Sequence, residues 1–240
     1  MAAAQARFWI AGASSNWNNT ANWSATSGGA GGASVPGAAN TVTFDANGNG
    51  QCNLDIIPTV GGITINGYAG IIDLVGRNLT TTGTNTFASG TVNNSGGAAS
   101  LVLNTTGTTT FSGTTFGANI TGSSARLLFH GSTFNGTITV TKDGNTNDIG
   151  NGGNTFNGAV SLTNASTQYL RLGNTNSDIF NNTLAVSIGN TGDIVLAYAA
   201  AGTQFNQNVV VNYSSTGDVL IGTNGGTSTS PRVAQSALVR

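Results

Sequence analysis

A short phrase centred on phenylalanine recurs along the chain, and its spacing constrains the fold more than any other feature. A clear copy spans residues 133–140, where Thr-Phe-Asn-Gly is followed by the alternating run Thr-Ile-Thr-Val. Further copies give a series centred on Phe116, Phe134, Phe156, Phe180 and Phe205. A period of roughly 20 residues is that of one supersecondary unit, which indicates a repeat architecture.

A second short apolar stretch lies between successive phrases, so each period contains at least two strands. These stretches are Arg126–Phe129, Tyr169–Leu172, Asp193–Leu196 and Asp218–Ile221, and Gly, Asn, Ser and Thr separate them from the phrases. Such a unit cannot bury its apolar face alone, whereas stacked units bury a continuous interior. We therefore predict an all-β fold, a right-handed parallel β-solenoid (β-helix) with short rungs of about 18–25 residues. The handedness follows from the chirality of parallel crossovers.

Composition excludes several other classes of protein. Gly (36), Thr (36) and Asn (31) dominate the 240 residues, while Lys occurs once and Glu not at all, which disfavours helical folds. Only 6% of the residues are charged and the net charge is -1, so we expect no nucleic-acid partner. No apolar run is long enough for a membrane helix, so we expect no membrane insertion. The single cysteine, Cys52, can form neither an internal disulfide nor a metal site, and we expect no cofactor.

The phrase phenylalanines occupy one fixed place in each rung, so their rings should stack on one another inside the coil. Ordinary core packing without alignment is the alternative. The Asn that follows Phe in most copies can form a ladder of side-chain amides at the next corner. Both roles are structural.

The three tryptophans, Trp9, Trp17 and Trp23, lie near the N-terminus, where the phrase has no clear copy. We predict three regions: a Trp-rich N-terminal cap over 1–45, the solenoid array over 46–230, and a tail or truncated continuation over 231–240. Bulky aromatics can cover the open interior and strand edges of a first rung. The functional alternative is a sugar-binding platform made by Trp17 and Trp23.

Residues with catalytic or metal-binding chemistry are few. Asp193 and Asp218 both follow Thr-Gly and lie one repeat period apart, so they are expected on adjacent rungs, with Asp148 and Asp178 as looser counterparts. Two such carboxylates are weak candidates for a cation site or for acid–base work, but a recurring Gly-Asp favours a turn. His130, the only histidine, ends a short strand, which favours a corner position over a catalytic one. We therefore predict no catalytic residues.

An ice-binding face is a further possibility, because Thr-rich runs occur at 80–84 and 105–110. The threonines do not hold one fixed Thr-x-Thr place through the sequence repeats, so this interpretation ranks lower. Strand propensity and hydroxyl bonding at corners explain the runs equally well.

The chain also resembles a known class of surface protein. Its opening, with Phe8-Trp9, Asn16-Trp17-Asn18-Asn19 and Thr41-Val42-Thr43-Phe44-Asp45, is similar to the start of autotransporter-like passenger regions in repetitive β-helix surface proteins of Gram-negative bacteria. Its rungs resemble the repeat arrays of giant secreted adhesins in gliding bacteria. The resemblance covers most of residues 8–229 and implies export, a cell-surface location and a role in adhesion or as a stalk. It carries over no binding residues.

From the residues and the resemblance together, we expect an extracellular structural or adhesive module of a larger surface adhesin or filament, without catalysis. Surface glycans, neighbouring repeats of a longer chain and a second copy bound end to end are the expected partners. A carbohydrate-active β-helix enzyme, either a polysaccharide lyase or a hydrolase, is the alternative. A self-assembling filament subunit is the third interpretation.

Overall fold

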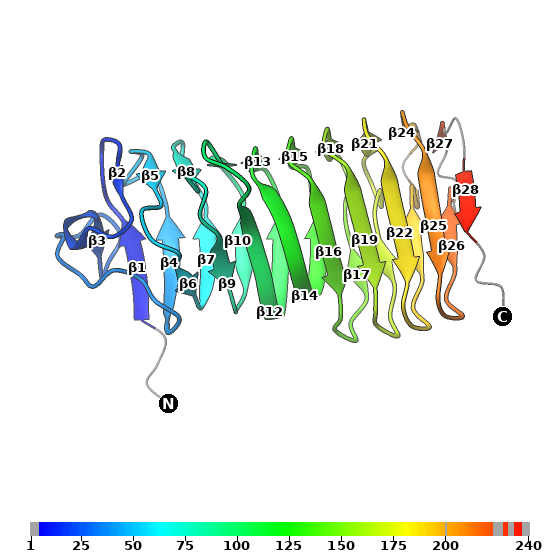
Figure 1. Ribbon diagram of the computed structural model, residues 1–240, viewed down its shortest axis with the longest axis horizontal. Helices are drawn as coiled ribbons and strands as arrows, with labels where there is room; N and C mark the ends of the chain where they lie inside the picture. Colours follow the sequence, from blue (N-terminus) through cyan, green and yellow to red (C-terminus); the bar gives the residue numbers. More distant parts are fainter. Residues whose placement is uncertain (1–4, 200, 223–227, 230–232, 237–240) are drawn as a thin grey trace.

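The strands wind into an elongated rod whose rungs lie side by side along one axis (Figure 1). The computed structural model describes residues 5–199, 201–222, 228–229 and 233–236. Successive rungs pair in parallel, and the predicted all-β, parallel β-solenoid is confirmed, with about eight turns. Its right-handed sense stays a prediction. Among the described residues, no helix is long and apolar enough to cross a membrane.

Three faces surround the interior, and we number them in chain order. Face 1 begins with strands paired in this order: β1 (Gln5–Trp9), β4 (Asn40–Phe44), β7 (Gly62–Ile65), β10 (Asn85–Phe87), the second half of β12 (Ser100–Phe111) and the second half of β14 (Asn119–Phe129). Beyond β14 it continues as a four-stranded sheet of β17 (Asp148–Ile149), β20 (Leu170–Arg171), β23 (Ile194–Leu196) and β26 (Val219–Ile221).

Face 2 is a ten-stranded sheet that contains the phrase phenylalanines. Its strands follow the order β2 (Ser15–Asn16), β5 (Cys52–Asn53), β8 (Ile71–Asp73), β11 (Thr91–Asn93), β13 (Thr115–Phe116), β15 (Thr133–Phe134), β18 (Thr155–Phe156), β21 (Ile179–Phe180), β24 (Thr203–Phe205) and β27 (Ser228–Thr229). The Cα register pairs each phrase phenylalanine with the next one, so the rungs in this part of the chain have the predicted lengths.

Face 3 contains the longer strands of the second half. It comprises β6 (Thr59–Val60), β9 (Leu79–Thr81), the first halves of β12 and β14, β16 (Ile138–Lys142), β19 (Val160–Asn164), β22 (Leu184–Ile188), β25 (Val209–Tyr213) and β28 (Val233–Ser236). Strands β12 and β14 pass from face 3 to face 1 without a break, and their register shifts between Thr105 and Thr108 at this corner. The burial pattern of β19 and β22 alternates strictly, as expected where one side of a strand packs on the interior.

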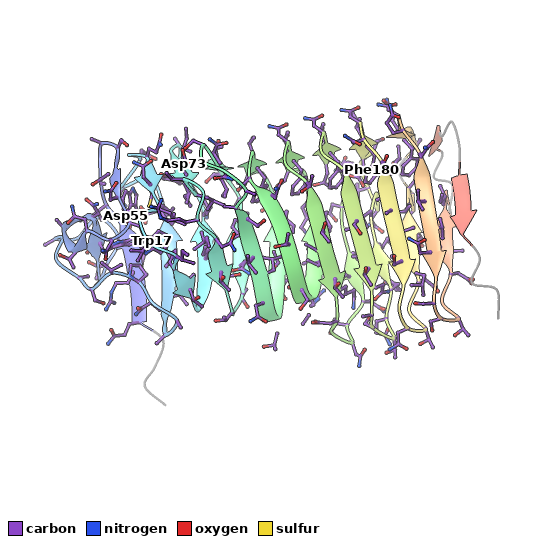
Figure 2. The ribbon with its side chains drawn as sticks, viewed as in Figure 1. Trp17, Asp55, Asp73 and Phe180 are labelled. Atoms are coloured by element: carbon purple, nitrogen blue, oxygen red, sulfur yellow. The ribbon has the colours of Figure 1, made fainter. Side chains whose placement is uncertain are left out.

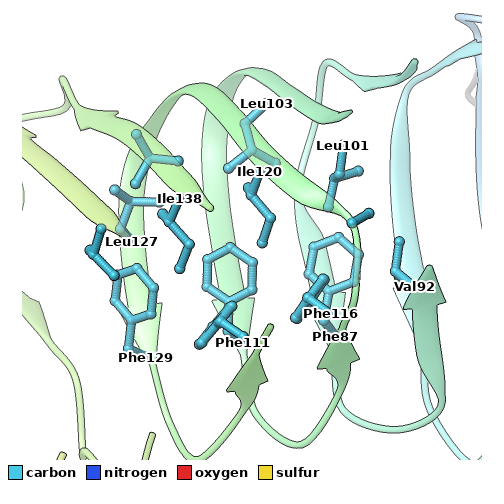
Figure 3. Close-up of a cluster of buried hydrophobic side chains, with 14 of the residues drawn as sticks. Phe87, Val92, Leu101, Leu103, Phe111, Phe116, Ile120, Leu127, Phe129 and Ile138 are labelled. Atoms are coloured by element: carbon cyan, nitrogen blue, oxygen red, sulfur yellow. The ribbon is translucent and has the colours of Figure 1, made fainter. Parts of the chain in front are cut away.

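Two stacks of phenylalanine rings fill the middle of the rod. The five phrase phenylalanines stack in register with ring centroids 4.5–5.2 Å apart and interplanar angles of 5–13°. A second stack on face 1 joins Phe87, Phe111 and Phe129, with centroids 5.6 and 5.1 Å apart (Figure 3). The two stacks meet edge to face, as Phe111 does with Phe116 at 5.5 Å. Aromatic pairs favour both of these arrangements.

The N-terminal segment both begins the coil and closes it. Strands β1 and β2 pair in parallel with β4 and β5, so parts of the predicted cap already belong to faces 1 and 2. After the short 3-10 helix η1 (Thr20–Asn22), strand β3 (Trp23–Ser24) turns back and pairs antiparallel with β1, which covers the free edge of that strand. Figure 2 shows Trp17 in this end of the rod, far from Phe180.

At the other end, part of the predicted tail continues the coil. Strand β28 lies within residues 231–240 and pairs in parallel with β25. Residues 223–227, 230–232 and 237–240, on which the predicted tail and the predicted end-to-end contact also rest, lie outside the described part of the chain.

Candidate functional site

The tryptophan platform predicted as one alternative is wrong, because no tryptophan ring reaches the surface. Trp9, Trp17 and Trp23 are each 0% exposed. The rings of Trp17 and Trp23 meet at 4.8 Å, and the Trp23 indole Nε1 donates a hydrogen bond to the Trp17 carbonyl at 2.8 Å. All three rings pack on Phe44, the first phenylalanine of the coil interior. A sugar cannot stack on them, and they instead fill the end of the core.

Asp193 and Asp218 lie on adjacent rungs but do not form a site for a cation. The Asp193 carboxylate accepts a hydrogen bond from the Asp218 backbone N–H at 2.9 Å, which is the turn role that their repeated Gly-Asp context favours. Within the described residues, no group of three or more His, Cys, Asp or Glu side chains could hold a metal ion. The ion pair found there joins Arg126 to Asp148, so no described arginine pairs with either aspartate.

His130 and Cys52 are also far apart. The His130 imidazole accepts the backbone N–H of Asn151 at Nδ1, 3.0 Å away, which fixes it at a rung corner, and burial lowers its pKa. Cys52 is fully buried on β5, and burial raises the pKa of its thiol. Three strands of face 2 separate β5 from β15, which follows His130. The geometry therefore assembles no Cys–His pair.

A buried polar cluster, which the sequence did not reveal, lies at the corner between faces 3 and 1. Lys142 is 0% exposed, and its Nζ donates to Ser166 Oγ at 2.8 Å and to the Gly144 carbonyl. Asp148 accepts hydrogen bonds from the Leu127 N–H at 2.7 Å and from Arg126 Nε at 3.1 Å. Burial lowers the pKa of Lys142 and raises that of Asp148. Lys142 and Asp148 face the interior and are not open to a substrate, whereas the Arg126 side chain is 36% exposed. The arrangement orders the corner.

Asp178 is buried in a different place, next to face 2, and is not stacked with Asp193. Its Oδ1 accepts two hydrogen bonds from Asn154, one from the backbone N–H at 2.9 Å and one from Nδ2 at 2.8 Å. Its Oδ2 is buried without a hydrogen-bond partner. Burial raises the pKa of this carboxyl to about 6.

The accessible polar side chains gather in rows on the faces of the rod. On face 2, a partly exposed Thr directly precedes each of the inward Phe116, Phe134 and Phe156, and the register aligns these threonines, Thr115, Thr133 and Thr155, with Thr91 on β11. The following asparagines form the predicted amide ladder, in which each Nδ2 donates to the Oδ1 of the preceding rung at 2.7–2.8 Å; the members are Asn135, Asn157, Asn181 and Asn206.

Face 3 presents paired hydroxyl groups on three successive rungs. On β14, Thr121 and Ser123 are partly exposed, and the register aligns them with Thr139 and Thr141 on β16. Ser161 and Thr163 on β19 occupy the same two positions. A fixed pair of outward hydroxyl positions therefore exists over these rungs, although the sequence repeats suggested none. It ends at the next rung, where Ala185 replaces the first hydroxyl.

The paired hydroxyls of face 3 border a broad, open groove of about 670 Å³, which we call the face 3 groove. Its polar lining consists of Thr80, Asn104, Ser123, Thr139, Thr141 and Asp143, and its remaining lining of Val102, Leu103 and Gly122. The Gly122 backbone has a φ of 106°, and a Cβ there would collide with the Leu103 carbonyl oxygen. A glycine here therefore lets β14 follow the backbone path that it takes at the floor of the groove.

The face 3 groove suits recognition of a neutral, hydroxyl-rich ligand better than catalysis. Its hydroxyls and its amide can donate and accept hydrogen bonds, and Asp143 is the single carboxylate in the lining. Sequence reasoning missed this site because its residues come from several strands and corners, none of which has a distinctive motif. The chain matches no protein-family model, no curated protein and no solved structure in the three comparisons.

Proposed function

We propose that this chain is a structural and adhesive β-solenoid module that acts without catalysis at the surface of a bacterial cell. The observation that carries the proposal is the continuity of its ladders. From Phe116 to Phe205 the interior rings stack without interruption, and from Asn135 to Asn206 the outer amides are bonded rung to rung. We expect such a rod to be stiff, because each rung is bonded to its neighbours.

The surface location rests on the resemblance to bacterial adhesins, and the adhesive role also has support from the face 3 groove. Sugars offer many hydroxyl groups, which the Thr, Ser and Asn side chains of the groove can satisfy. The chain's low charge supports this proposal, because neutral glycans need no counter-charge. The ligand class of the proposal is therefore a neutral surface glycan.

The test is binding of the purified chain to a panel of neutral surface glycans. The variant Thr139→Val/Thr141→Val removes two groove hydroxyls and keeps the β-branched shape. Thr133→Val/Thr155→Val is the matched control, since it makes the same changes on face 2, outside the groove. We expect saturable binding that weakens about tenfold or more in the groove variant and stays unchanged in the control. Absence of binding by the folded chain, or equal binding by both variants, would overturn the adhesive role of the groove.

A further inference from the structure

Arg171 is packed against two tyrosine rings on the outside of face 1. Its guanidinium carbon lies 4.5 Å from the centroid of the Tyr169 ring and 3.6 Å from that of the Tyr198 ring. The Nη1 group also donates to Asn174 Oδ1 at 3.2 Å. Arg171 lies in β20 and Tyr169 directly precedes that strand, whereas Tyr198 comes from the next rung, after β23. Two rungs thus hold the guanidinium in one orientation.

The charge of Arg171 is not neutralised by a neighbouring carboxylate. Within the described residues, the ion pair present is that of Arg126 with Asp148. Along face 1, the register places Ile149 on one side of Arg171 and Val195 on the other, and both are apolar. The adjacent rung contributes Asp193, but among the described contacts its carboxylate makes no ion pair with Arg171 and accepts the Asp218 N–H instead. A fixed cation without a counter-ion is notable in a chain with so few charges.

The orientation of the guanidinium determines which of its donors a ligand can reach. Its Nε is buried and has no hydrogen-bond partner, and Nη1 already makes one bond to Asn174. The remaining hydrogens of Nη1 and Nη2 therefore form the edge available to a ligand. Arginine presents such an edge as a planar fork that matches the two oxygens of a carboxylate. Stacking on tyrosines reduces the conformational freedom lost when a ligand binds.

We propose that Arg171, Tyr169 and Tyr198 form a binding site for the carboxylate of an acidic sugar, a hexuronate unit within a polysaccharide. The guanidinium edge holds the carboxylate, while Ile149, which is 38% exposed, and the tyrosine rings offer apolar surface to the sugar ring. A sugar is favoured over an acidic peptide because aromatic rings flank the cation. The choice of a glycan rests on the proposed adhesive function, although this site lies on face 1, apart from the face 3 groove.

The experiment compares binding of an oligogalacturonide with that of its fully methyl-esterified form by calorimetry. Esterification removes the negative charges and leaves the sugar rings in place. The variant Arg171→Gln removes the cation, and Arg171→Lys keeps the charge but loses the planar fork. Arg77→Gln is the matched control, because it removes one positive charge at an arginine whose Nη1 bonds to backbone carbonyls. Circular dichroism confirms that each variant is folded.

We expect the acidic oligomer to bind at low salt and the ester to bind about tenfold more weakly or worse. Arg171→Gln should lose this preference, Arg171→Lys should keep part of it, and Arg77→Gln should match the wild type. Equal binding of acid and ester, an unaffected Arg171→Gln, or no binding would overturn the proposal. Equal binding of a glutamate oligopeptide would overturn its restriction to sugars. If these results overturn the acidic-sugar site but the chain still binds neutral glycans, the proposed function remains intact.

Discussion

The rings of Phe156 and Phe180 lie 4.5 Å apart with an interplanar angle of 9°, the closest contact in the interior stack. Parallel strands lie about 4.8 Å apart, so the two rings are separated by nearly the distance between their rungs. Phe134 covers the other side of the Phe156 ring at 4.9 Å. The ring of Phe156 is thus enclosed between two others, and the stack follows the pitch of the backbone.

Replacement of Phe156 by Ala should therefore cost about 3–5 kcal/mol of unfolding free energy, because it removes a ring stacked on both sides and opens a cavity. Phe156→Leu keeps most of the volume and should cost clearly less. Denaturant titration followed by circular dichroism measures both. A loss below about 1 kcal/mol for the Ala variant would show that the stack contributes little to stability.

The buried carboxyl of Asp178 makes the stability depend on pH. Its pKa is raised from 3.8 to about 6 in the folded chain, so the folded state binds the proton more tightly than the unfolded state does. The free energy of unfolding should then rise as the pH falls from 7 through 6 towards 4, because over this range the folded state binds more of this proton than the unfolded state does. Its contribution at pH 7 is unfavourable, by up to about 3 kcal/mol.

Asp178→Asn imitates the protonated carboxyl, so it should stabilise the chain at pH 7 and flatten the pH dependence between 4 and 7. Asp193→Asn is the control, since that aspartate lies partly exposed at a corner. Thermal melts over this pH range measure the effect. A wild-type stability that falls steadily as the pH drops from 7 to 5, unchanged in Asp178→Asn, would contradict the sign of the argument.

The sequence allowed the solenoid and its face 2 ladder to be predicted because Phe and Asn keep a fixed place in each rung. The second stack was missed, since Phe87, Phe111 and Phe129 do not precede Asn. The sequence predicts a cap for the tryptophans but leaves a sugar platform as the alternative, because an aromatic residue can serve at a core end or in a sugar-binding surface. Only the path of the first rung distinguishes the two.

The Arg171 cluster could not be predicted for a different reason. The register pairs Arg171 with Val195 of β23. Tyr198 lies beyond the end of β23, at a corner, so strand register does not place it beside Arg171. The rung from Phe116 to Phe134 is shorter than the rung from Phe180 to Phe205, so corner residues of different rungs do not occupy equivalent positions. Strand positions can be aligned from sequence, whereas contacts between corners depend on the path of each loop.

The backbone at Gly122 links the fold to the proposed binding surface. Its φ of 106° is rarely adopted by other residues, and an added Cβ would meet the Leu103 carbonyl oxygen. Gly122→Ala should therefore cost about 2 kcal/mol or more and should distort the face 3 groove. Gly189→Ala is the matched control: its added Cβ would make ordinary contacts, the nearest at 3.5 Å, and its stability should change little.

The two measurements on these variants are thermal stability and binding to the neutral-glycan panel. We expect Gly122→Ala to weaken both, because the strained backbone must shift where β14 borders the groove. Binding lost at a temperature well below the melting transition would assign the effect to groove shape and not to unfolding. Full stability in Gly122→Ala would mean that the strand relaxes around the new methyl group, and the groove floor would then not depend on a glycine at this position.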